Sequence, residues 1–171
     1  MLPRAVQLDY RPGTFRALKR TLLCHHPKRK QRKCMPTPES MRETVLRYLQ
    51  LVGEQDLEAV LALFADSISV EDPVGGPTGT HVVGLDAVSN FFKKGFARSR
   101  PSPTLTGPVV TTGGNEVAFP FTLRLDLAGK PHELDVVDVI QFDDRGQIIS
   151  LRAFWNYDER REDPNQDDLV S

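Results

Sequence analysis

The chain has 171 residues, a net charge of −1 and 39% hydrophobic residues, which is the length of one domain and the composition of an ordinary globular protein. No run of about 18 apolar residues occurs, which excludes a membrane-spanning helix. The net charge hides a division. Residues 1–34 hold ten Lys or Arg and one Asp, a net +9, whereas residues 35–171 hold twelve basic and 22 acidic residues, a net −10.

The basic segment 1–34 is predicted to be a disordered or non-native N-terminal extension, with Met35 as the natural start. An organelle transit peptide and a nucleic-acid-binding or anionic-surface-binding arm are the alternatives. Nucleic acid is therefore an expected partner only through this segment. Metal-ligand residue types also occur here, at spacings that match no zinc module: Cys24, His25, His26 and Cys34. The acidic body has no cysteine and no secretory signal is visible, so we expect a cytoplasmic protein.

The body, residues 35–157, opens with helical patterns. Ser40 followed by Glu43 forms a capping box, which predicts a helix start at Ser40, and Gly53 is expected to end that helix. Apolar residues at helical spacing predict three helices, which run from Ser40 to Gly53, from Asp56 to Phe64, and from Gly84 through Phe96.

Strands dominate the second half of the body. Period-two alternation predicts strands at 67–72, 105–111, 116–127, 132–142 and 148–156, separated by a loop at 73–79 and turns at 113–115, 128–130 and 143–146. Pro120 suits a bend or bulge better than a central ladder position. Residues 158–171 read as a charged, disordered C-terminal tail. Helices followed by a strand meander predict an α+β domain: a curved antiparallel sheet wrapped around three N-terminal helices, with a cone-shaped cavity.

Two aspartates lie on apolar strand faces. Asp72 shares a face with Ile68 and Val70, and Asp138 sits in mid-strand between inward-facing aliphatic residues. Tyr48 lies on the apolar stripe of the first helix, so its phenol is expected to point into the same cavity. Buried acids with shifted pKa values are typical of catalytic sites. The alternative interpretation is structural: Tyr48 packs in the core, Asp72 caps the following turn and Asp138 makes a structural hydrogen bond.

These residues lie in segments that together resemble the bacterial steroid Δ5-3-ketosteroid isomerases, of the SnoaL-like group in the nuclear transport factor 2 superfamily. The resemblance covers roughly residues 38–157 and is carried, in order, by residues 47–52, 70–75, 106–109, 120–121, 134–139 and 142–146. It implies the cone-shaped fold, a homodimer, a 3-oxo-steroid substrate and no cofactor or metal.

The resemblance also implies roles. Asp72 would be the general base that moves a proton from C4 to C6, and Tyr48 and Asp138 would form the oxyanion hole. The apolar walls for the steroid would come from substrate-binding residues whose alternative is ordinary core packing: Val74, Phe92, Phe119, Phe121 and Trp155. Phe64 and Phe92 stand where some members carry tyrosines, which puts the rate in question more than the reaction.

Three other functions stay open. The chain could be a non-steroid isomerase or polyketide cyclase of the same fold, or a non-catalytic module that binds apolar ligands. An epoxide hydrolase of this fold would need an Asp-Arg-Asp arrangement in the cavity. Arg124 shares strand parity with Asp126 and is therefore expected to point outward, which argues against that activity.

Overall fold

The structure is a computed structural model that describes residues 35–76 and 79–162. The basic segment, with its cysteines and histidines, lies outside these residues, and so does the end of the tail, residues 163–171. The expectations for these segments stay predictions. Within the described part, no helix is both long and apolar enough to cross a membrane.

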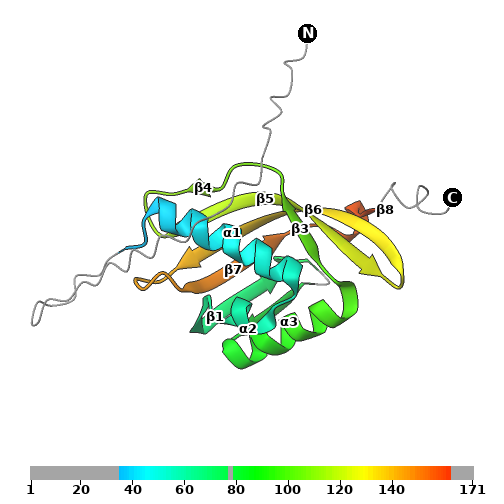
Figure 1. The fold of residues 1–171 in the computed structure, drawn as a ribbon, viewed down its shortest axis with the longest axis horizontal. Coiled ribbons are helices and arrows are strands. Elements are labelled where there is room, and N and C mark those ends of the chain that lie inside the picture. Colours follow the sequence, from blue (N-terminus) through cyan, green and yellow to red (C-terminus); the bar gives the residue numbers. More distant parts are fainter. Residues whose placement is uncertain (1–34, 77–78, 163–171) are drawn as a thin grey trace, which may run out of the picture. The chain divides into compact units, whose positions relative to one another are not determined.

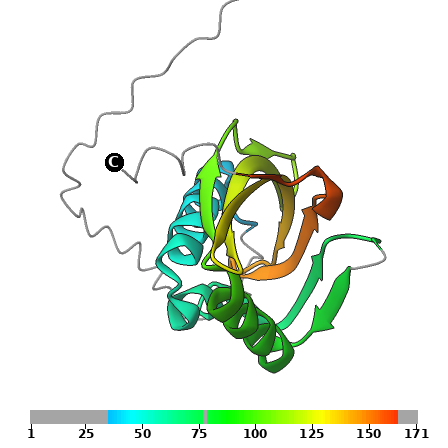
Figure 2. The ribbon, with the colours of Figure 1, turned by 90° about the vertical axis from the view of Figure 1, so that its right-hand side faces the viewer.

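Helices precede most of the sheet, as the sequence predicted. The helices are α1 (Pro38–Glu54), α2 (Leu57–Leu61) and α3 (Leu85–Ser99). The strands are β1 (Phe64–Asp72), β2 (Thr80–Val83), β3 (Ser102–Leu105), β4 (Val110–Thr111), β5 (Glu116–Leu127), β6 (Lys130–Phe142), β7 (Ile148–Phe154) and β8 (Arg161–Glu162), with a 3-10 helix η1 (Tyr157–Glu159) before the last strand. Figures 1 and 2 show α1 and α3 lying along one side of the curved sheet. The predicted α+β cone fold is confirmed.

The centre of the sheet is the β5–β6 hairpin. Its two strands form twelve antiparallel residue pairs without a register shift. The order of strands in the sheet is β2-β1-β7-β6-β5-β3. Ala128 and Gly129 close the hairpin at φ 56° and 79°, the paired positive values of a two-residue type I′ turn. This long, regular ladder positions the inward-facing residues of β6.

One strand pairing differs from the predicted antiparallel sheet. β1 lies parallel to β7, and residues Ser69 to Glu71 pair in register with Ser150 to Arg152. Parallel neighbours need a long crossover between them, and here the rest of the sheet and α3 supply it. The meander prediction missed this because alternation within a strand carries no information about which strand lies beside it.

Three boundaries of α1 and α2 also differ from the prediction. Thr37, and not Ser40, is the N-cap of α1, because its Oγ1 accepts a 3.2 Å hydrogen bond from the Ser40 amide and Pro38 suits the first helical position. Gly53 lies inside the helix, which ends instead where Gln55 adopts a left-handed conformation at φ 57°. The second helix is shorter than predicted because β1 already begins at Phe64.

The strand at 105–111 is two short strands. Pro120 lies in the regular β5–β6 ladder opposite Val137, so no bulge occurs on that side. On its other side the partner strand is interrupted between β3 and β4, where the Thr106 amide donates a 3.1 Å hydrogen bond to the Pro120 carbonyl. The missing amide hydrogen of Pro120 thus faces the gap, where no ladder bond is lost.

Three further features were not predicted. β2 pairs with β1 although only its Val82 is partly buried, which explains why its sequence gave little signal. Residues 158–162, expected to belong to the disordered tail, are instead ordered: they complete η1 and continue into β8. In β7, Ile149 is an extra residue opposite the step from Gln141 to Phe142, so the strict alternation predicted for this strand is interrupted and Ile148 is fully buried.

We expect Gly107→Ala to lower the free energy of unfolding by about 1–3 kcal/mol, the usual cost of overpacking. An added Cβ would lie only 2.7 Å from Cγ of the Pro120 ring, which cannot swing away. Gly113→Ala is the matched control, because its Cβ would meet nothing within 4 Å. Urea denaturation compares the two variants with the parent, and equal stabilities would show that the 106–109 segment can retreat from Pro120.

Candidate active site

An apolar cavity opens between α1, α3 and the sheet. It is lined by Tyr48, Leu49, Val52, Asp72, Phe91, Phe92, Gly95, Phe96, Ser99, Pro101, Pro103, Phe121, Leu123, Val136, Asp138, Leu151, Ala153 and Trp155. The structure thus brings Tyr48, Asp72 and Asp138 together in one cavity, from three elements that are distant in sequence. Polar groups are few among these residues, so each has a strong effect on the electrostatics of the site.

Asp138 is the most deeply buried of the three. It lies in the middle of β6, paired with Phe119 on one side and Ala153 on the other, and is 2% exposed. Its Oδ1 has no hydrogen-bond partner among the described residues. Burial, followed by the charge of Asp72, raises the pKa of Asp138 well above its usual range. The carboxyl is therefore held in its neutral form, which can donate a hydrogen bond to a ligand.

Tyr48 reaches the cavity from the buried face of α1 and is 6% exposed. Burial and then the nearby charges of Asp138 and Asp72 raise the pKa of the Tyr48 phenol well above its usual range, so it stays a donor. Phe64 packs against Tyr48 at 6.4 Å between ring centroids. Phe64 has no polar group for the phenol, and no described residue hydrogen-bonds the Tyr48 hydroxyl.

Asp72 is the last residue of β1 and is less buried than Asp138. Burial raises the pKa of Asp72, but a hydrogen bond opposes the rise: Trp155 Nε1 donates to Asp72 Oδ1 at 2.5 Å. A donor to the carboxylate stabilises its charged form. Of the two aspartates, Asp72 is therefore the one that ionises more readily.

The five predicted wall residues divide in two. Phe92, Phe121 and Trp155 line the cavity, whereas Phe119 and Val74 do not. Phe119 is fully buried and stacks on Phe121 at 5.9 Å between centroids, so it supports the wall from behind. Val74 follows the turn after Asp72, and its amide donates a 2.9 Å hydrogen bond to the carbonyl of Ala153.

Sequence reasoning missed one contact and part of the lining. The hydrogen bond between Trp155 and Asp72 joins residues 83 positions apart, and alternation could show only that both face inward. Gly95 and Ser99 lie one helical turn apart on α3, beside its apolar residues. The prediction counted only apolar residues on this helix and therefore missed both, although their spacing could have indicated them. Pro101 and Pro103 follow the helix and left no periodic pattern.

The arrangement combines one carboxyl that can ionise with two neutral hydrogen-bond donors in an apolar environment. Such a set can remove a proton beside a carbonyl group and stabilise the oxyanion that results. Arg124 is exposed, as its parity predicted, and does not line the cavity. Among residues 35–76 and 79–162 there is no cluster of three His, Cys, Asp or Glu side chains that could hold a metal ion.

Comparison with known proteins places these residues in a family. A family model described as the SnoaL-like domain matches residues 45–151, which include Tyr48, Asp72 and Asp138. Over 115 residues the chain is 33% identical to a steroid Delta-isomerase of Nocardioides simplex, covering 67% of this chain and 89% of that protein.

Two further relatives extend the comparison. The epoxide hydrolase LasB of Streptomyces lasalocidi is 29% identical over 133 residues, and the match covers 71% of this chain but only 43% of LasB. The crystal structure of RV0760c from Mycobacterium tuberculosis in complex with estradiol-17β-hemisuccinate matches with a TM-score of 0.65 at 27% identity, covering 71% of this chain and 98% of that one.

We expect Asp138→Asn to stabilise the domain increasingly as the pH rises above about 4, the ordinary range of an aspartate. The raised pKa of Asp138 means that the unfolded chain ionises first, so this residue costs the folded state stability as the pH rises towards its folded pKa. Thermal unfolding of variant and parent across a pH series measures the difference.

Asp135→Asn is the control, on the same strand but exposed. The hydrogen bonds from Arg161 lower the pKa of Asp135, so it contributes stability that is present above its unfolded pKa and is lost as the pH falls. The two variants should therefore show opposite pH trends. Parallel trends would contradict a neutral Asp138.

Proposed function

We propose that this chain, which belongs to the SnoaL-like domain family, is a cofactor-independent steroid Δ-isomerase. It would move the C5=C6 double bond of a 3-oxo-steroid to C4=C5. The observation that carries the proposal is the pairing, in one apolar cavity, of an ionisable Asp72 with a neutral Asp138 and a neutral Tyr48. The identity to a steroid Delta-isomerase over most of that protein supports it.

The reaction is a proton transfer within the substrate. The Asp72 carboxylate removes a proton from C4, and the electron pair of the C–H bond moves into the ring, leaving the negative charge on the C3 oxygen of a dienolate. Asp72 then returns the proton to C6, and the conjugated Δ4 ketone forms. No net oxidation occurs, and the carboxylate is regenerated.

Tyr48 and Asp138 would stabilise the dienolate. Both are held neutral by burial, so both can donate a hydrogen bond to the C3 oxygen. These bonds strengthen as charge develops on the oxygen, and therefore they stabilise the transition state more than the ground state. The unpartnered Oδ1 of Asp138 would gain a partner only when substrate is bound.

The cavity walls suit a flat apolar substrate. Phe92, Phe121 and Trp155 supply aromatic surface. Leu123 on β5 and Pro103 on β3 extend the apolar wall among the strands farthest in the sheet order from β1 and its Asp72. A related protein of known structure, RV0760c, binds a steroid ester, which supports a steroid as the ligand of this cavity. The aromatic walls would hold the rings while Asp72 moves the proton.

The homodimer implied by the family resemblance stays a prediction. Val137 and Phe154 pair across β6 and β7 on the outer face of the sheet and are 42% and 40% exposed. A second copy would have apolar surface to cover there.

We expect Asp72→Asn to abolish nearly all turnover of 5-androstene-3,17-dione while leaving steroid affinity within a few-fold of the parent. The amide cannot accept the C4 proton but fills the same space. Ultraviolet absorbance of the conjugated enone follows the rate, and quenching of Trp155 fluorescence follows binding. Asp66→Asn, an exposed position on the same strand, is the control. Binding without turnover by the parent chain would indicate a carrier.

Tyr48→Phe and Asp138→Leu should each reduce kcat by about 10² or more, the usual cost of losing one oxyanion-hole donor. KM should change less, because the donors act mainly on the developing charge. Steady-state kinetics on the same steroid separate the two parameters. A silent Tyr48→Phe variant would remove Tyr48 from the oxyanion hole.

Epoxide opening is the second candidate: no arginine among the described residues lines the cavity, so the Asp-Arg-Asp arrangement is incomplete, but one ionisable and one neutral aspartate still offer a base and an acid. Asp72 would accept a proton from an attacking water molecule, whose oxygen bonds to an epoxide carbon, while Asp138 or Tyr48 protonates the epoxide oxygen that leaves this carbon. The relative LasB favours this chemistry, although the chain spans less than half of it. Incubation with a steroid epoxide, analysed by mass spectrometry for added water, distinguishes hydrolysis from isomerisation.

A further inference from the structure

Trp155 stands just past the end of a ladder. β7 ends at Phe154, which pairs with Val137 of β6, and Trp155 is the next residue. Backbone beyond the end of a strand frays unless it is tied down. The indole nevertheless meets Asp72 at 2.5 Å, so the chain after Trp155 must supply an anchor.

That chain returns to the same strand. β8 pairs with the beginning of β6, where Arg161 lies opposite Glu133. Six residues separate Phe154 from Arg161, but only three separate Val137 from Glu133 on β6. The excess of three residues is taken up by the turn of η1. Residues 156–162, here called the strap, are therefore held at both ends by β6.

The turn within the strap is bonded to itself. The Asn156 side chain accepts a hydrogen bond from the Asp158 amide and donates one to Glu159, both at 3.1 Å. The Arg160 guanidinium lies 4.0 Å from the centroid of the Tyr157 ring and donates to the Tyr157 carbonyl at 3.0 Å. These contacts make the turn rigid. A displacement of the backbone at Arg161 should therefore also displace Trp155, because the turn between them does not deform easily.

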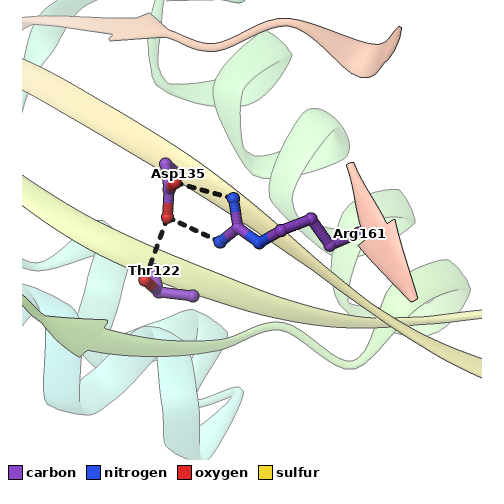
Figure 3. Close-up of polar contacts among 3 residues, drawn as sticks. All are labelled: Thr122, Asp135 and Arg161. Carbon is purple, nitrogen blue, oxygen red and sulfur yellow. Dashed lines mark hydrogen bonds and ion pairs between the residues drawn. The ribbon is translucent and has the colours of Figure 1, made fainter. Parts of the chain in front are cut away.

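An ion pair fastens the far end of the strap (Figure 3). The two guanidinium nitrogens of Arg161 donate to the two oxygens of Asp135 at 2.7 and 2.8 Å, and Thr122 adds a hydrogen bond to Asp135 at 3.2 Å. Exposed ion pairs usually contribute little to global stability, but a bidentate fork with a third donor fixes geometry well. We expect its effect to be local.

We propose that Arg161 and Asp135 are positioning residues: through the strap they hold Trp155 where its indole donates a hydrogen bond to Asp72. Neither residue reaches the cavity. Their effect on turnover rests on the proposed role of Asp72 as the base, whereas their effect on Trp155 does not.

The test uses intrinsic fluorescence, because Trp155 is the single tryptophan of the chain. A pH titration of its emission should show a step from Asp72, identified by its absence in Asp72→Asn. Tyr48 and Asp138 also face Asp72 inside the cavity, and Glu71, His81 and Arg152 lie on the outer side of β1 and its neighbours. Among all these titratable groups, Asp72 alone is hydrogen-bonded to the indole of Trp155, so its ionisation should have the largest effect on the emission.

Arg161→Gln and Asp135→Asn should each move the midpoint of this step to higher pH and make Trp155 more accessible to acrylamide. The reason is that a weaker hydrogen bond from the indole stabilises the Asp72 carboxylate less. Arg161→Lys keeps the charge without the fork and should give intermediate values. Arg145→Gln, an exposed change of the same charge in the turn between β6 and β7, should leave both readouts unchanged.

Two results would overturn the inference: midpoints and quenching equal to the parent in both strap variants, or shifts that appear only together with loss of the whole fold in thermal unfolding. If Arg161→Gln does not fold, Arg161→Lys and Asp135→Asn decide the question. Should the chain turn over steroid, the acid limb of kcat/KM moves with the fluorescence midpoint. Should it turn over none, the proposed function fails while the fluorescence shift still supports the strap.

Discussion

The burial of the Asp138 carboxyl, whose Oδ1 has no hydrogen-bond partner among the described residues, is the constraint on which the rest of the structure depends. An unpaired polar group in an apolar interior costs about 1–3 kcal/mol, and an ionised one would cost more. The twelve-pair hairpin of β5 and β6 holds the group there, and the ladder to Ala153 fixes its other side. The long, unshifted ladder stabilises the sheet enough to offset the free-energy cost of the buried acid. This explains why the acid lies in the centre of the sheet and not at an edge.

The two aspartates differ because they occupy different places in their strands. Asp138 is flanked on both sides by paired strands and is buried, whereas Asp72 ends β1 and accepts a hydrogen bond from the indole of Trp155. One carboxyl is thus pushed towards its neutral form by desolvation, and the other is partly relieved by a donor. Two chemically identical side chains thus differ in how readily they ionise because of their positions alone.

The sequence predicted what alternation and helical spacing encode: the bounds of β5, the inward placement of Asp72 and Asp138, and the stripe of α3. It could not predict relations between distant segments. The parallel neighbour of β1 and the hydrogen bond from Trp155 to Asp72 depend on how strands meet, which no local pattern records. Predicted helix boundaries were wrong where two residues could serve as the cap. At the start of α1 both Thr37 and Ser40 are suitable N-caps, and Thr37 takes this position.

The extra residue in β7 has a consequence for how this domain can change length. Ile149 reverses the alternation of the strand, and only after this reversal do Leu151, Ala153 and Trp155 face the helices. Loss of a single residue between Ile149 and Trp155 would turn the indole to the outside of the sheet. The turn at η1 has no alternation of inward and outward residues to preserve, since its three extra residues only connect β7 to β8. Insertions and deletions should therefore accumulate at η1 and be absent from β7 in related chains.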